Sequence, residues 1–124
     1  MKTVIEYVDK FAALRDACGN DVDVAIDFHG RVSPAMAPIF CRELEKYYPM
    51  FVEEPVLPEN VDSMVRVARS TTIPIATGER LFTPVALGRY LKAGSQVLQP
   101  DLSHCGGILS TYKIASMAAN YYAL

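Results

Sequence analysis

Hydrophobic positions divide the chain into segments of alternating helical and strand character. Spacings of three and four residues predict helices over residues 3–17, about 34–47, a third following Asn60, 84–92 and 108–120. Short apolar runs between them predict strands at 22–27, 50–53, 73–76 and 97–99. Ala25 stands between apolar neighbours, which is typical of a strand buried on both faces. The first helix is expected to bury Val4, Val8, Phe11 and Leu14, and the last helix Ile108, Tyr112, Ala115 and Ala119.

Strands that alternate with helices in this way indicate a parallel sheet, because each helix carries the chain back to begin the next strand. A repeat of about 26 residues suits the unit of a (β/α) TIM-type barrel, which normally needs eight units and about 250 residues. The sequence therefore predicts an α/β fold, a partial barrel of about four parallel strands with flanking helices. No Gly-x-Gly-x-x-Gly follows a strand, so the usual mark of a dinucleotide-binding fold is missing.

Helix boundaries are marked by capping residues and by proline and glycine. Ser33-Pro34 and Thr83-Pro84 each combine a cap with a proline at the first helical position. Gly94 is expected to end the fourth helix. Pro38 conflicts with a start at 34, so either that helix starts later or its first turn is irregular.

Three carboxylates follow three successive predicted strands at equal spacing. Asp27, Glu53 and Glu79 lie 26 residues apart in each case. A single acid after a strand is usually a cap or a solvated loop residue, but the repeated placement indicates one shared site. Adjacent strand ends are close enough for one ion, and an all-oxygen donor set favours Mg²⁺ over zinc. Asp101 follows the fourth strand in the same way.

Other polar residues lie near these acids. His29 is two residues beyond the first acid, on the same side of the chain, where it can exchange a proton near neutral pH. Glu54 is expected to point away from the site, as an outer partner or in an ion pair with Arg80. Arg31 is expected either to hold a substrate carboxylate or to be solvated. His104 lies among glycines, where capping or loop packing is the better interpretation.

Composition narrows the function classes. A net charge of −2 argues against nucleic-acid binding. The three cysteines fit neither a disulfide framework nor a zinc pattern, so we expect packing cysteines in a reducing, cytoplasmic compartment. No run approaches the ~20 apolar residues of a membrane span. We expect a small-molecule ligand, with no nucleic-acid or membrane partner, and the pair Tyr121-Tyr122 in the core or an interface.

Four motifs resemble the enolase superfamily, and within it the galactonate-type dehydratases of the mandelate racemase subgroup. They are Asp-Phe-His-Gly-Arg at 27–31, Phe-Val-Glu-Glu-Pro-Val-Leu-Pro-Glu-Asn at 51–60, Ala-Thr-Gly-Glu-Arg-Leu at 76–81 and Gln-Pro-Asp-Leu-Ser-His-Cys-Gly-Gly-Ile at 99–108. The resemblance implies that residues 1–124 are an incomplete C-terminal barrel domain holding the third to sixth strands. It also implies that the N-terminal capping domain and a catalytic base at the seventh strand lie outside this segment.

The resemblance also implies residue roles. Asp27, Glu53 and Glu79 are the expected Mg²⁺ ligands, His29 the general acid, and Asp101 the support of the missing base. The implied reaction is dehydration of a sugar acid to a 2-keto-3-deoxy acid through an enediolate, a type of intermediate that Mg²⁺ stabilises. The full-length form is expected to be a homo-oligomer.

Three functional interpretations follow. The first is a Mg²⁺-dependent sugar-acid dehydratase of which this chain is a fragment. The second is another reaction on the same scaffold, such as racemisation or dehydration of a different aldonate. The third is a non-catalytic remnant. In all three we expect the isolated chain to lack turnover and, with two open sheet edges, to self-associate.

Overall fold

The computed structural model describes residues 2–124 as a regular alternation of helices and short strands. The helices are α1 (Lys2–Cys18), α2 (Ala37–Leu44), α3 (Val61–Ala68), α4 (Pro84–Ala93) and α5 (Ile108–Ala119), with a 3-10 turn, η1 (Glu45–Tyr47), after α2. The strands are β1 (Ile26–Asp27), β2 (Val52–Glu53), β3 (Ile75–Thr77) and β4 (Val97–Leu98). All nine predicted elements are present, although the strands are shorter than the apolar runs that predicted them.

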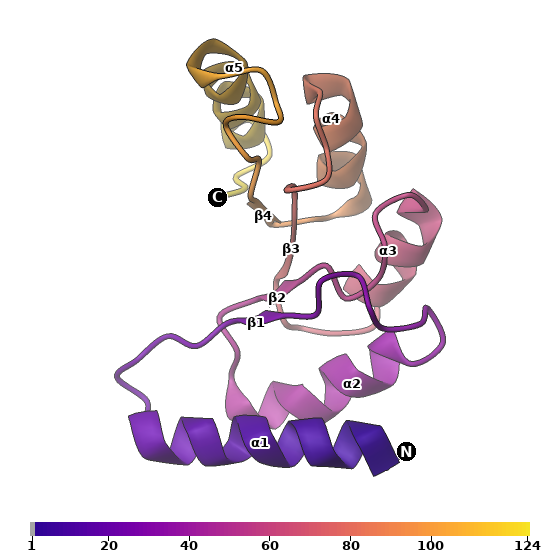
Figure 1. Ribbon diagram of the computed structural model, residues 1–124, viewed down its shortest axis with the longest axis vertical. Coiled ribbons are helices and arrows are strands. Elements are labelled where there is room, and N and C mark those ends of the chain that lie inside the picture. Colours follow the sequence, from indigo (N-terminus) through magenta and orange to yellow (C-terminus); the bar gives the residue numbers. More distant parts are fainter. Residues whose placement is uncertain (1) are drawn as a thin grey trace.

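The four strands form one parallel sheet in chain order, β1-β2-β3-β4. Ile26 pairs with Val52, and Val52 with Ile75. The helices follow one another along one side of the strands, from α1 and α2 at one end of the molecule to α4 and α5 at the other (Figure 1). This arrangement confirms the predicted α/β class with four parallel strands.

The starts of α3 and α4 follow the capping signals in the sequence, whereas the predicted cap at Ser33-Pro34 is wrong, because α2 has Met36 at its N-cap and no side-chain cap hydrogen bond. The Asn60 side chain accepts a hydrogen bond from the Ser63 backbone at 3.1 Å, and Thr83 does the same for Ala86 at 3.1 Å. Gly94 ends α4 in the left-handed region, at φ 98°. The conflict at Pro38 is resolved by a later start, because α2 begins at Ala37 and proline falls within its first two positions, where its missing N–H is tolerated.

Two apolar clusters hold the layers together. The large cluster joins α1, α2, α3 and α4 to β2 and β3, and its most buried members include Cys41, Leu44, Val52, Met64 and Val67. The small cluster is formed by Leu87, Cys105 and Ile114, at the α5 end. Cys41 and Cys105 are thus buried packing residues, as predicted, and Cys18 is half-buried; all three are free thiols.

Several predicted burial positions are wrong. Ala25 is exposed, because β1 is the first strand of the sheet and has a neighbour on one side only. On α1 the buried stripe ends with Arg15 rather than Leu14, which is 46% exposed. On α5 the buried residues are Ile114 and Ala118, whereas the predicted positions 108 and 112 face outward because α4 contacts the opposite face of the helix.

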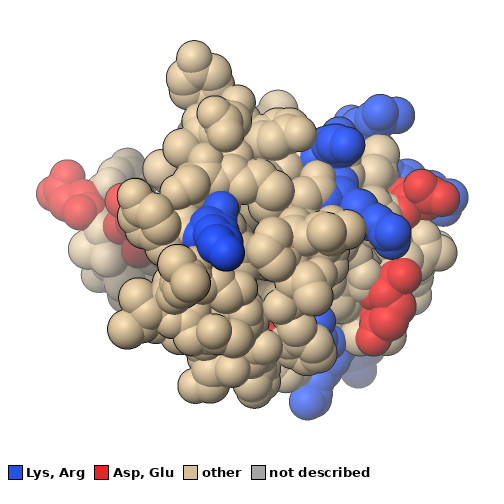
Figure 2. All heavy atoms as spheres, turned by 90° about the horizontal axis from the view of Figure 1, so that it is seen from above, with Lys and Arg blue, Asp and Glu red and all other residues tan. Residues whose placement is uncertain are grey.

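The α5 end carries a wide uncharged surface. Figure 2 views the molecule from that end and shows few charged side chains over its centre. Exposed apolar residues of α5 and the chain end are Ile108, Leu109, Tyr112, Tyr121, Tyr122 and Leu124. The tyrosine pair Tyr121-Tyr122 therefore lies outside the core of this segment, and its placement in an interface stays a prediction. Among residues 2–124 no helix is long and apolar enough to cross a membrane.

Candidate active site

The three predicted metal ligands lie at the carboxyl ends of three adjacent strands. Asp27 is the last residue of β1 and pairs in register with Glu53, the last residue of β2. Glu79 lies two residues beyond the end of β3. The parallel sheet therefore brings three carboxylates, far apart in sequence, to one edge.

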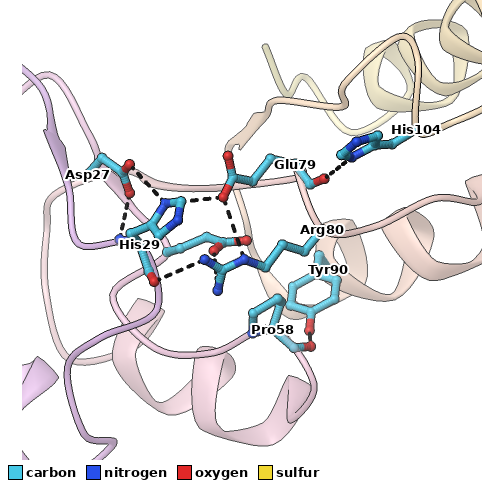
Figure 3. A network of polar contacts seen from close by, with 8 residues as sticks. Asp27, His29, Pro58, Glu79, Arg80, Tyr90 and His104 are labelled. Atoms are coloured by element: carbon cyan, nitrogen blue, oxygen red, sulfur yellow. Dashed lines mark hydrogen bonds and ion pairs between the residues drawn. The ribbon is translucent and has the colours of Figure 1, made fainter.

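His29 connects two of these acids. Its Nδ1 lies 3.5 Å from Asp27 Oδ2 and 3.2 Å from Glu79 Oε1, so the ring stands between the ends of β1 and β3 (Figure 3). The His29 backbone N–H also donates to Asp27 Oδ1 at 2.6 Å. This turn holds His29 at φ 53°, a left-handed conformation that a residue with a side chain rarely adopts. Such strain is often found at functional sites.

Glu53 lies in the middle of the three acids. Partial burial, together with the negative charges of Asp27 and Glu79, raises its pKa above the usual range. Gln99, just after β4, opposes this shift: with its amide nitrogen facing the carboxylate, it donates to both Glu53 oxygens at 3.3 and 3.1 Å. Gln99 was given no role from sequence, although it stands two residues before Asp101 in the fourth motif, on the same side of an extended chain.

Glu54 pairs with Arg80, as predicted. Its side chain is fully buried, and Arg80 Nη1 lies 3.3 Å from Glu54 Oε2. Burial raises the pKa of Glu54 to about 7, and the arginine opposes that rise. Arg80 also lies 3.5 Å from Glu79 Oε1 through Nε and donates from Nη2 to the His29 carbonyl oxygen at 3.2 Å.

Asp101 lies at the end of the fourth unit but belongs to a turn of its own. Its Oδ1 accepts the His104 backbone N–H at 2.8 Å, and this hydrogen bond lowers the pKa of Asp101. His104 Nδ1 is 3.4 Å from the Glu79 carbonyl oxygen, and its ring packs edge-on against Phe82. These contacts agree with the loop-packing interpretation of His104.

The donor chemistry at this edge fits a hard divalent cation. The three acids supply oxygen only. After burial, the charges of Asp27 and Glu79 are the next causes of the raised pKa of Glu53, and a bound cation would offset this repulsion. Within residues 2–124, no three His, Cys, Asp or Glu side chains gather at metal-binding distance, and His29 fills the space between two of the acids. The ligand set Asp27, Glu53 and Glu79 stays a prediction.

A cleft of about 700 Å³ opens beside His29, between β1, α1 and α2. Its polar lining residues include Asp27, Arg31 and Ser33, and its apolar walls come from Phe28 and Met36. This volume lies within the range of small-molecule sites. Arg31 is exposed and therefore reaches both this cleft and solvent.

The sequence pattern of a family described as "Enolase C-terminal domain-like" matches residues 2–123. The chain belongs to this family. The resemblance stated from the four motifs is thereby confirmed, and the four-stranded sheet corresponds to part of the barrel of enolase superfamily proteins.

Similar proteins place this enolase-type segment within longer chains. It is 50% identical over 118 residues to a D-galactonate dehydratase from Klebsiella pneumoniae (strain 342). The matched region covers 94% of this chain and 31% of that protein. A member of the enolase superfamily from Salmonella Typhimurium matches 98% of the chain at TM-score 0.95 and 37% identity. A racemase from Streptomyces coelicolor A3(2) with bound magnesium matches 98% at TM-score 0.94 and 28% identity. The chain spans about a third of these relatives' lengths, 31% and 34% in the two structures.

Proposed function

We propose that this segment belongs to a Mg²⁺-dependent dehydratase that converts a galactonate-type sugar acid to a 2-keto-3-deoxy acid. The observation that carries the proposal is the position of His29, whose Nδ1 lies 3.2 Å from Glu79 and 3.5 Å from Asp27 at the strand ends. The 50% identity to a protein named D-galactonate dehydratase supports the same reaction class. The complete protein is proposed to act on a small sugar acid as a homo-oligomer.

The residues of the segment divide the work of such a reaction. Asp27, Glu53 and Glu79 would hold the ion, which supplies positive charge to offset the charge that develops on the substrate carboxylate. His29 would donate a proton to the departing 3-hydroxyl group. Its Nδ1 contacts Asp27 and Glu79, which places the ring at the same strand ends as two of the proposed metal ligands. Asp101 would support a base supplied from outside the segment.

A second candidate is racemisation or another acid-sugar dehydration on the same scaffold. The structural similarity to a racemase, at TM-score 0.94, favours it. The two reactions differ in what they require of His29, because racemisation at the carbon alpha to the carboxylate releases no hydroxyl group. In a complete protein that carries this segment, a His29→Gln variant that keeps full racemase activity would select racemisation.

The metal proposal can be tested on the 124-residue chain itself. We expect Mg²⁺ to raise its melting temperature, because a ligand that binds only the folded state stabilises that state. Asp27→Asn should abolish the shift, and Asp62→Asn, on the exposed surface of α3, should preserve it. Unchanged melting of the wild-type chain across a Mg²⁺ titration, followed by circular dichroism, would argue against an assembled metal site.

The reaction can be tested in a complete protein. Residues 2–123 can replace the matching segment of the Klebsiella D-galactonate dehydratase, and the keto product can be followed after addition of galactonate and Mg²⁺. We expect turnover by the chimera and its loss in the His29→Gln version. A folded chimera that binds Mg²⁺ without forming the keto acid would contradict the dehydratase proposal.

A further inference from the structure

The guanidinium group of Arg80 joins three loops that follow three different strands. It lies 3.3 Å from Glu54 Oε2 after β2 and 3.5 Å from Glu79 Oε1 after β3, and it donates to the His29 carbonyl oxygen after β1 at 3.2 Å. Figure 3 shows Arg80 lying across the gap between His29 and Glu79. One side chain therefore contacts both the proposed proton donor and one of the proposed metal ligands.

The loops that contact the Arg80 side chain have unusual backbone conformations, and one of them lets the guanidinium group approach closely. His29 and Glu54 both have positive φ, at 53° and 37°. Gly30 is also left-handed, at φ 67°, and a Cβ there would lie 2.8 Å from Arg80 Nη1. The Gly30 N–H donates to the Glu54 carbonyl oxygen at 2.8 Å, which fixes the two loops to each other. These conformations cost free energy and persist where the surroundings hold them.

The Glu54–Arg80 ion pair is not well explained by a contribution to folding stability alone. The Glu54 side chain is fully buried, Arg80 is 29% exposed, and neither Glu54 oxygen has a hydrogen-bond partner among residues 2–124. Replacing a buried ion pair by apolar groups is often neutral or stabilising, because desolvation offsets much of the attraction. The pair therefore needs another explanation, and the groups that Arg80 contacts supply one.

We propose that Arg80, anchored by the buried Glu54, is a positioning residue that fixes the relative placement of His29 and Glu79. Its planar fork of donors reaches three loops at once, which the single ammonium of a lysine does not match. The role assigned to Glu79 rests on the proposed function, whereas the contact with His29 is independent of any metal. A positioning role and a simple charge effect predict opposite changes in Mg²⁺ affinity when Arg80 is replaced.

The sign of the change in Mg²⁺ affinity separates positioning from charge. Removing a positive group beside three carboxylates should strengthen cation binding if the effect were purely Coulombic. If Arg80 positions Glu79, Arg80→Met should instead weaken Mg²⁺ binding, about 10-fold, as for partners that orient metal ligands. Isothermal titration calorimetry on the 124-residue chain measures this. Arg80→Lys should lie between the two, and Arg66→Met, on the exposed face of α3, should match the wild type.

A double-mutant cycle tests the role of Glu54. If Glu54 acts through Arg80, Glu54→Gln should weaken Mg²⁺ binding in the wild-type background and change it little in the Arg80→Met background. Equal effects in both backgrounds would mean that Glu54 acts independently, and that part of the inference would be wrong. Glu54→Gln keeps the side-chain shape and serves as the second variant if circular dichroism shows that Arg80→Met does not fold.

The imidazole signal of His29 gives a readout that needs no metal. The chain has two histidines, so their side-chain NMR signals can be assigned by substituting one. We expect Arg80→Met, Arg80→Lys and Glu54→Gln to shift and broaden the His29 signal more than that of His104. An unchanged His29 signal with equal or tighter Mg²⁺ binding would overturn the inference. A wild-type chain that does not bind Mg²⁺, with a His29 signal that still depends on Arg80, would overturn only the proposed metal site.

Discussion

The two ends of the molecule share one βα pattern but differ in how well their helices are covered. From α1 to α4 the inward faces meet in the large apolar cluster, where Leu44 is 1% and Met64 0% exposed. At the other end α5 contributes Ile114 to the small cluster, while Ile108 is 80% and Tyr112 70% exposed. The two end helices each have a helix neighbour on one side only (Figure 1), but α1 buries Val4, Val8 and Phe11 whereas α5 buries Ile114 and Ala118.

This difference indicates uneven local stability. Elements with few buried apolar contacts open at lower free energy than elements in the main core. The predicted metal ligands Asp27, Glu53 and Glu79 follow the first three strands, on the well-packed side, whereas Asp101 belongs to the thinly packed end. Asp27, Glu53 and Glu79 should therefore be held more rigidly than Asp101.

The largest expected effect contrasts the same substitution at the two ends. Leu44→Ala should cost about 3 kcal/mol, because it leaves a cavity in the large cluster. Leu109→Ala, on the exposed face of α5, should change stability by less than about 0.5 kcal/mol. Urea unfolding followed by circular dichroism measures both. Equal costs would mean that the outer face of α5 is covered in solution, for example by self-association.

At the well-packed end the Arg15 side chain holds several backbone segments together. Among residues 2–124, no arginine or lysine at the α5 end makes a comparable set of hydrogen bonds. Its guanidinium donates to four backbone carbonyl oxygens, those of Gly19, Val22, Tyr47 and Tyr48. Arg15→Met should destabilise the chain by about 2 kcal/mol, since four carbonyl oxygens in partly buried hydrogen bonds lose a charged donor. Arg89→Met, on the exposed side of α4, is the matched control. A variant at position 15 as stable as this control would show that water replaces the lost donors.

Gly78 lies just after β3, where the chain packs closely against the backbone of Gln99, just after β4. A Cβ at this position would lie 2.5 Å from the Gln99 carbonyl carbon. Gly78→Ala should therefore cost about 1–3 kcal/mol through overpacking against backbone. Gly19→Ala, where φ is +70° but no atom lies within 4 Å, measures the conformational cost alone. Thermal unfolding should show the larger loss of stability for Gly78→Ala. A larger loss for Gly19→Ala would mean that the backbone conformation costs more than the contact with Gln99.

The smallest expected effect is a pH dependence of folding stability that comes from Glu45. This residue of η1 forms hydrogen bonds with Thr71 and Thr72, in the segment before β3. Its Oε1 accepts hydrogen bonds from the Thr72 N–H and the Thr71 hydroxyl, both at 2.7 Å, and these lower the pKa of Glu45 below its usual range. A depressed folded-state pKa contributes stability above the unfolded pKa and loses it as pH falls through the folded value. The wild type should therefore exceed Glu45→Gln in stability by a constant margin above about pH 5, and that margin should shrink below about pH 4.5. Urea unfolding at a series of pH values checks the trend, and a margin that grows in acid would contradict it.

Sequence reasoning reached the elements and the strand-end acids because both depend on local rules. The caps at Asn60 and Thr83 and the stop at Gly94 act over one turn of helix, so sequence places them well. The acids Asp27, Glu53 and Glu79 repeat with the βα unit, and parallel strands end at one edge. The contact of Gln99 with Glu53 escaped prediction, because it depends on the approach of β4 to the other strands.

The sequence by itself determined the order of helices and strands, the parallel sheet and the family, since periodicity, caps and motifs lie along the chain. The tertiary structure alone decided which faces are buried and how the polar groups meet. Arg15 replaced Leu14 in the core because carbonyls of η1 and the following turn surround it. Ile108 and Tyr112 stayed exposed because burial requires a neighbour as well as a hydrophobic pattern. Arg80 reaches His29, Glu54 and Glu79 because folding brings together three loops that no local rule connects.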